Sequence, residues 1–173
     1  MGISGAQLER YLPSEVMPSR RKSIELSESE IDEYLQTAHT LIIVSNGLRG
    51  FPHPMPMWFC ADSQRNCYCT TFAKSQKVLN WKRDPRASLL VESGEQYAEL
   101  KGLVIYAQTE VIEDLASVID TLVNINAKGR NLTEEQRQGL RRSVSSTAAK
   151  RIVLKFVPEK FISWDHAKLG GRY

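Results

Sequence analysis

The sequence predicts a mainly β protein, an antiparallel barrel with appended helices. Its 173 residues make one domain the simplest division of the chain. Several short segments rich in β-branched and apolar residues are separated by polar turns, which is typical of hairpins. The helical segments between them do not alternate regularly with the strands, as they would in a doubly wound parallel sheet. Together these observations favour an antiparallel barrel.

The N-terminal part of the chain contains the first boundary and the first helix signal. Residues 1–23 mix proline, serine and charged residues, so we expect a loosely ordered arm followed by a domain over 24–173. Ser27 begins a Ser-x-x-Glu pattern that Glu30 completes. This pattern is a capping box, which satisfies free backbone N–H groups at a helix start and predicts a helix over 28–37.

The remaining elements follow from apolar periodicity and turn residues. Strands are predicted over 40–44, 54–61, 67–72, 87–92, 100–112, 151–157 and 161–164, and helices over 74–82, 114–126 and 133–149. The strands 54–61 and 67–72 flank a polar turn, so we expect them to pair as a hairpin. Pro54 and Pro56 lack an N–H group and place the first half of their strand at an edge, a bulge or a ligand site. Pro158 is expected to separate the last two strands.

Composition and charge disfavour several classes of protein. The 23 lysine and arginine residues slightly outnumber the 20 acidic residues and are spread along the chain. This disfavours a nucleic-acid-binding protein and suits a small anionic ligand. No segment is apolar for long enough to span a membrane, and residues 1–21 lack the apolar run of a signal peptide. Cys60, Cys67 and Cys69 are therefore interpreted as small strand residues in a reducing cytoplasm, not as metal ligands.

A candidate phosphate site lies where a predicted strand ends and a helix begins. Thr70 and Thr71 supply hydroxyl groups, and Lys74, Ser75 and Lys77 follow within one turn. Phosphate groups bind hydroxyls, cations and the free N–H groups of a helix N-terminus, and the two lysines would share a helix face. The alternative is an ordinary solvated helix start with a serine cap. No glycine-rich nucleotide loop is present in the sequence.

A second candidate is the aromatic and proline-rich segment 51–59. Prolines that break regular strand pairing leave other backbone groups available to a ligand, and Met57 or Trp58 could lie beside a flat ring system. The alternative is a buried edge strand, and His53 is either an acid–base group or structural. The sequence has no nucleophile elbow and no evident acid–base pair. This suits redox chemistry, in which a cofactor carries the difficult step.

These segments resemble a known family when they are taken together. The motifs are Pro54-x-Pro56-Met57-Trp58-Phe59, Thr70-Thr71-Phe72-x-Lys74-Ser75-x-Lys77-Val78-x-Asn80, Arg83-Asp84-Pro85-Arg86, Val91-Glu92-x-Gly94, Tyr97-x-Glu99-Leu100-Lys101-Gly102 and Ser163-Trp164-Asp165-His166-x-Lys168-Leu169-Gly170-Gly171-x-Tyr173. In this order they resemble the pyridoxamine 5'-phosphate oxidase-like split barrels. The resemblance extends from about residue 31 to the end of the chain.

The resemblance implies a six-stranded split barrel that forms a homodimer. It also implies FMN or the deazaflavin coenzyme F420 bound in grooves between the subunits, and hydride transfer between that cofactor and a small organic substrate. The implied cofactor-binding residues are Pro56, Met57 and Trp58 at the ring, and Thr70, Thr71, Ser75 and Lys77, with Lys74, at the ribityl chain and phosphate. Asn80 and Arg86 would fix the helix and the next strand. The implied residues that close the pocket or meet the substrate are Trp164, Asp165, His166 and Lys168.

Several alternatives stay open from the sequence. The arginine and histidine pattern specific to vitamin B6 oxidation is missing near the C-terminus, so we favour F420 slightly over FMN. The F420 tail would need basic residues, and the candidates are Arg49, Lys82, Arg83 and Lys168. The same barrel could instead bind flavin or haem without turnover. Nucleic-acid binding through Arg141, Arg142, Lys150 and Arg151 is disfavoured, because basic residues are favourable at a helix end in any case.

Overall fold

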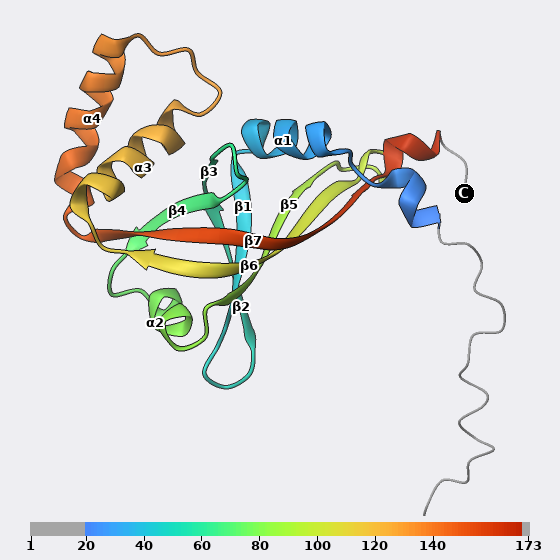
Figure 1. Ribbon diagram of the computed structural model, residues 1–173, viewed down its shortest axis with the longest axis horizontal. Helices are drawn as coiled ribbons and strands as arrows, with labels where there is room; N and C mark the ends of the chain where they lie inside the picture. Colours follow the sequence, from blue (N-terminus) through green and yellow to red (C-terminus); the bar gives the residue numbers. More distant parts are fainter. Residues whose placement is uncertain (1–19, 171–173) are drawn as a thin grey trace, which may run out of the picture.

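The computed structural model describes residues 20–170, and these form a curled antiparallel sheet with helices at its ends (Figure 1). The seven strands have the order β2-β1-β5-β6-β7-β4-β3. The strands are β1 Thr40–Asn46, β2 Pro52–Trp58, β3 Cys60–Ala61, β4 Cys67–Phe72, β5 Arg86–Ser93, β6 Lys101–Ile112 and β7 Arg151–Asp165. The helices are η3 Arg20–Ile24, α1 Glu28–Thr37, α2 Gln76–Arg83, η4 Tyr97–Glu99, α3 Leu115–Ala127, α4 Glu134–Ala148 and η5 His166–Leu169.

The predicted split barrel with appended helices is confirmed, with seven strands in place of six. The additional strand is the two-residue β3, because the predicted strand 54–61 divides at the buried Phe59. Most of the arm expected over 1–23 lies outside the described residues, and its last four residues belong to η3.

The predicted pairing of 54–61 with 67–72 is wrong for most of its length. β2 folds back on β1 through a turn at 47–51 that includes Gly50 with a φ of 82°. Only β3 pairs with β4. Of the three positions predicted from the prolines, an edge, a bulge or a ligand site, the structure shows the edge, since β2 is the first strand of the sheet. Prolines at alternate positions direct their nitrogen atoms to the same side of a strand, and the outer side of an edge strand needs no ladder donors.

The last strand also differs from its prediction. Pro158 does not end it, and β7 runs for 15 residues. Pro158 lies opposite Ala107, and Lys160 lies opposite Tyr106, so one residue of β7 is extra at this point. A β-bulge of this kind accommodates a proline without ending the ladder.

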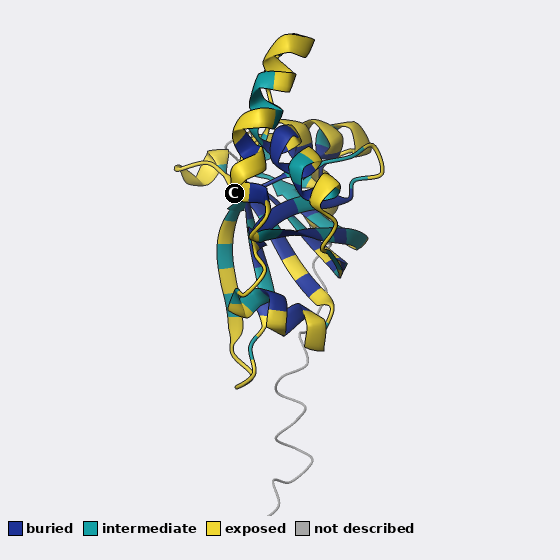
Figure 2. Cartoon of the chain, turned by 90° about the vertical axis from the view of Figure 1, so that its left-hand side faces the viewer, coloured by how far each residue is buried: buried dark blue, intermediate teal, exposed yellow. Residues whose placement is uncertain are grey.

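The core lies inside the curve of the sheet, where residues of alternating position point inward. Leu41 and Ile43 of β1, Leu89 and Val91 of β5, and Leu103 and Ile105 of β6 are almost completely buried. Figure 2 shows buried and exposed residues alternating along the strands, as a period of two requires. A second cluster joins α3 and α4 to β7. No helix of the described residues is long and apolar enough to cross a membrane.

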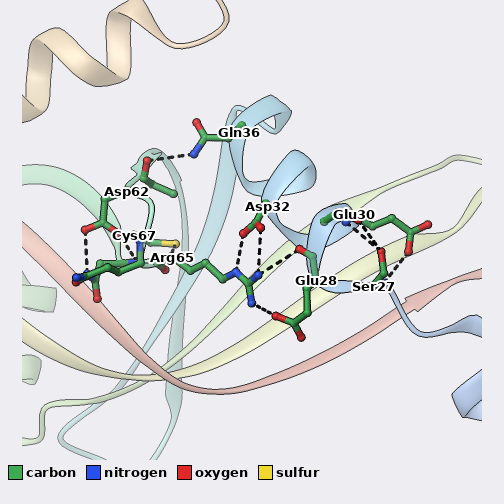
Figure 3. Close-up of polar contacts among 12 residues, drawn as sticks. Ser27, Glu28, Glu30, Asp32, Gln36, Asp62, Arg65 and Cys67 are labelled. Atoms are coloured by element: carbon green, nitrogen blue, oxygen red, sulfur yellow. Dashed lines mark hydrogen bonds and ion pairs between the residues drawn. The ribbon is translucent and has the colours of Figure 1, made fainter.

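Helix α1 is fixed to the turn between β3 and β4 by Arg65 (Figure 3). The capping box predicted for α1 is present, since Ser27 Oγ accepts from the backbone N–H of Glu30 and the Glu30 carboxylate accepts from Ser27 N–H. Arg65 Nε donates to Asp32 Oδ1 at 2.6 Å, and the same guanidinium forms an ion pair with Glu28. The hydrogen bond from Arg65 lowers the pKa of Asp32.

Candidate functional site

Three side chains of the predicted phosphate site meet where β4 turns into α2. Lys77 Nζ donates to Thr71 Oγ1 at 3.2 Å, and Thr71 Oγ1 lies 3.3 Å from Ser75 Oγ. Ser75 is the residue that precedes α2, and its side chain makes no cap hydrogen bond there. The cluster therefore places two hydroxyls and one ammonium beside the N-terminus of a helix, where backbone dipoles favour an anion.

The ammonium of Lys77 has no acidic partner in the part of the chain that the structure describes. The side chain is half-buried, and the eight ion pairs among the described residues do not include it. Burial lowers the pKa of Lys77, and the nearby Cys69 thiol acts in the opposite direction. A partly buried cation without a carboxylate is costly unless another anion binds it. These residues fit a phosphate group.

The supporting roles predicted for Asn80 and Arg86 agree with their contacts. Asn80 is buried, and its Nδ2 donates to Ser45 Oγ of β1 at 2.9 Å, which fixes α2 against the sheet. Arg86, the first residue of β5, pairs with Asp84 at 2.8 Å, and this pairing is the main reason for the low pKa of Asp84.

Thr70 lies apart from Thr71, although the two are adjacent in sequence. Successive residues of a strand point to opposite faces, so Thr70 faces away from the lysine cluster. Thr70 lines a cavity of about 270 Å³ together with Met57 and Trp58. Two of the three residues predicted to lie beside a ring are therefore in this cavity, and Pro56 is exposed next to them on β2.

The other predicted site residues are not part of this cluster. Lys74 is exposed in the turn before α2, which starts two residues later than predicted, so Lys74 and Lys77 do not share a helix face. Trp164 lies on β7 eleven residues beyond Val153, the partner of Thr70, which is on the order of 30 Å along a strand. In Figure 1 the C-terminal end of β7 and α2 lie at opposite ends of the molecule.

The C-terminal segment has contacts of its own. Trp164 packs over Gly102, where a Cβ atom would lie 2.1 Å from the indole ring. Lys168 Nζ donates to Glu30 at 2.6 Å and to the carbonyl oxygen of Glu25 at 2.7 Å. The hydrogen bond from Lys168 is the main reason that the pKa of Glu30 is lowered to about 2. Within one chain Lys168 joins η5 to the start of α1.

The sequence reasoning missed the contribution of α3 to the candidate site. The cavity beside Thr70 is closed by Leu122, Ile125 and Asn126 of α3 and by Arg151 of β7. These residues come from segments that sequence patterns describe only as an amphipathic helix and a strand. The sequence signal that could have indicated a site near α3 is the pair Lys128 and Arg130, which flank Gly129 directly after that helix.

Comparison with known proteins assigns the family. The sequence profile described as pyridoxamine 5'-phosphate oxidase matches residues 27–165. The chain belongs to this family. The conserved hypothetical protein Rv2991 from Mycobacterium tuberculosis is 30% identical, and the match covers 88% of this chain and 93% of Rv2991 with a TM-score of 0.77. No curated protein matches the chain.

Two structures of the same fold with lower sequence identity come from proteins that are named for different functions. An F420 reductase is 20% identical, with 75% of this chain and 94% of the reductase covered and a TM-score of 0.56. The haem storage protein HutZ from Vibrio cholerae is 17% identical, with coverages of 79% and 94% and a TM-score of 0.58. At these identities the likeness shows the fold of the family and leaves the chemistry to the residues of this chain.

Proposed function

We propose that this family member is an oxidoreductase that binds FMN or coenzyme F420 and transfers a hydride between it and a small organic substrate. The observation that carries the proposal is the half-buried Lys77, which lies with Thr71 and Ser75 at an uncapped helix start and lacks a described acidic partner. These three residues would hold the phosphate of the cofactor. Met57, Trp58 and Thr70 would lie on the side of the ring system.

The roles of the protein residues follow from this placement. A bound flavin or deazaflavin supplies the hydride chemistry, and the protein supplies binding and orientation. Lys77 and the hydroxyls of Thr71 and Ser75 would bind the phosphate through charge-assisted hydrogen bonds. The apolar surfaces of Met57 and Trp58 would limit the access of water to the ring.

We further propose that the active form is a homodimer with the cofactor at the subunit interface. Within one chain, Trp164 and Lys168 are far from the phosphate cluster. They can therefore approach a cofactor bound at that cluster only if they belong to a second copy of the chain. Large apolar side chains are also exposed outside the cavity beside Thr70, among them Leu48, Phe51 and Leu79. Exposed apolar residues of this size favour an interface. Sedimentation at decreasing concentration should show that dissociation to monomers accompanies cofactor release.

Of the two cofactors we favour F420, because the B6-specific substrate residues are missing and one structure of the same fold is an F420 reductase. The test is a titration of cofactor-free protein with FMN and with F420 at low and high salt. If F420 is correct, its affinity should fall more steeply with salt than that of FMN, since its tail carries additional carboxylates. Tight FMN binding without measurable F420 binding at low salt would reverse the choice, and binding of neither would overturn the proposed function.

A second candidate is a protein that binds flavin or haem without turnover. The observation in its favour is His166, whose Nδ1 lies 2.9 Å from the carbonyl oxygen of Tyr97. If Nδ1 carries the proton, Nε2 is left as a metal ligand, which is the usual arrangement of an iron-binding histidine. A Soret band on haem addition that His166→Ala abolishes would support this candidate. Reoxidation of the reduced cofactor by a substrate would support the enzyme.

A further inference from the structure

Two cavities between the C-terminal end of α3 and the end of β2 share Trp58 as a lining residue. We call the two together the α3 groove. One part is the cavity of about 270 Å³ beside Thr70, and the other has a volume of about 460 Å³. Trp58, Ile125 and Asn126 line both parts. The larger part alone is in the range of pockets that bind small organic molecules.

The α3 groove is lined by basic residues and by none of the acidic residues that the structure describes. The basic residues are His39, Lys128 and Arg130 in the larger part and Arg151 in the smaller part. Among the described residues, none of these four forms an ion pair with a carboxylate. Positive charge concentrated in a concave site favours an anionic ligand.

The ammonium group of Lys128 does not bind the free carbonyl groups at the C-terminal end of α3. A lysine after a helix commonly donates to the last free carbonyl groups. Lys128 Nζ is instead buried without a hydrogen-bond partner and lies 3.4 Å from the centre of the Phe59 ring. Gly129, with a φ of 70°, turns the chain directly after it. A buried ammonium with unused donors is stabilised when an anion reaches it.

Arg151 repeats this arrangement in the smaller part of the groove. Its guanidinium carbon lies 4.6 Å from the centre of the Phe72 ring, and its buried Nε has no hydrogen-bond partner. Asn126 lines both parts of the groove, and its Nδ2 donates to the carbonyl oxygen of Leu122. Trp58 is 68% exposed and offers a flat apolar surface on which a planar molecule can stack.

We propose that the α3 groove binds the substrate, and that this substrate is a planar conjugated molecule carrying a carboxylate. The inference rests on the proposed function, because Met57, Trp58 and Thr70 line the groove and are also the residues assigned to the ring side of the cofactor. Thr71 faces the other side of β4, and Ser75 and Lys77 lie beside it there. The groove is thus placed for the molecule that reacts at the ring, and the lysine cluster for the cofactor phosphate.

The experiment compares two probes with the same naphthyl ring, the anion 2-naphthoate and its neutral amide 2-naphthamide. Calorimetric titration uses the full chain without added cofactor, because the cavity and its cations belong to the chain itself. We expect 2-naphthoate to bind about tenfold more tightly than 2-naphthamide. Lys128→Met and Arg130→Gln should each remove most of this preference. Arg130 is exposed, so Arg130→Gln should fold normally. It therefore keeps the test valid if Lys128→Met does not fold.

Arg137→Gln is the matched control, because Arg137 lies on α4 and lines a different cavity beside Asp120 and Glu134. It should leave the preference for 2-naphthoate unchanged. FMN and F420 titrations of the same proteins separate the two proposals. A preference that depends on Lys128 and Arg130, in a protein that binds neither cofactor, would support the groove and overturn the proposed function.

The opposite pattern would contradict the proposal that the α3 groove binds the substrate, and it would not contradict the proposed function. That pattern is cofactor binding together with equal affinity for the two naphthyl probes. Loss of 2-naphthoate binding in Lys77→Ala, with no effect of the groove variants, would also overturn it, because the probe would then occupy the phosphate site.

Discussion

The turn between β3 and β4 differs from the region around α2 and α3 in whether its cationic side chains have carboxylate partners. Arg65 in the turn is bound by two carboxylates and a backbone carbonyl group of α1 (Figure 3). Lys77 and Lys128 are each partly buried and have no described acidic partner. The first arrangement is complete within the chain, whereas the second leaves cations without an acidic partner among the described residues.

The comparison matters because the two arrangements have different energetic costs. Exposed ion pairs such as Lys82 with Glu113 contribute little to stability and do not indicate a ligand site. A buried cation without a partner costs free energy of folding, and proteins keep such groups where a ligand uses them. Buried cations without an acidic partner therefore indicate the candidate site more clearly than the total number of basic residues in the sequence does.

The largest effect is expected from Lys77→Ala. It should weaken binding of whichever cofactor binds by roughly 1.5–3 kcal/mol, because one charge-assisted hydrogen bond to the phosphate is lost. Its stability without cofactor should not fall below that of the parent, since Lys77 makes only one hydrogen bond within the described chain and its burial without an acidic partner is costly. Cofactor titration and urea unfolding of the same samples measure the two quantities. Lys150→Ala is the control for loss of a lysine, and unchanged affinity in Lys77→Ala would remove this residue from the site.

Arg65→Met should give the reverse result. The variant loses the contacts that join the β3–β4 turn to α1, so the melting temperature should fall by a few degrees while cofactor affinity is unchanged. Thermal unfolding and cofactor titration measure the two effects. A normal melting temperature with weakened cofactor binding would mean that ion pairing inside the chain does not distinguish structural cations from binding cations.

A smaller effect is expected from Thr71→Val. It removes the hydroxyl that lies between Lys77 and Ser75 and keeps the shape of the side chain. Cofactor affinity should fall by about 0.5–1.5 kcal/mol, the usual contribution of a neutral hydrogen bond. Thr70→Val is the matched comparison, because Thr70 faces the groove. If the two variants weaken the cofactor equally, the phosphate is not confined to the lysine side of β4.

The sequence predicted most elements of the fold, because their signals are local. The capping box at Ser27 and the alternating pattern of β1 each depend on a few neighbouring residues. The partner of β2 was missed because pairing depends on the turn at 47–51 and on the buried Phe59. The length of β7 was missed because the bulge opposite Tyr106 belongs to two strands at once.

The candidate site was predictable only in part, for a similar reason. Thr71, Ser75 and Lys77 are close in sequence, and the structure brings them together. Thr70 was grouped with them, but strand alternation separates it. Lys128 and Arg151 lie far along the chain from Trp58, and no local pattern relates them to it. Their relation arises only when α3 folds over the sheet.

The last prediction concerns the pH dependence of stability that Lys128 causes. Burial lowers the pKa of Lys128 from 10.5 to about 8 in the folded protein, and the neighbouring thiols of Cys67, Cys60 and Cys69 act in the opposite direction. Between these two pH values the unfolded chain binds more protons than the folded chain at this residue. Stability conferred by Lys128 should therefore rise with pH from about 8 to 10.5, and stay constant below that window.

Urea unfolding of the parent and of Lys128→Met between pH 7 and pH 10 isolates this effect. The thiols have the contrary dependence, because burial raises the pKa of Cys60 to about 11 and that of Cys67 to about 12. Lys128 lowers the pKa of these thiols, but the folded parent and the folded variant both keep them protonated up to pH 10, so their contribution cancels in the difference. The stability of the parent relative to the variant should increase above pH 8. Saturating 2-naphthoate should move that increase to higher pH, because a bound carboxylate favours the charged lysine. A difference that does not change with pH would mean that Lys128 is as well solvated as an ordinary surface lysine, and it would remove the contrast with Arg65.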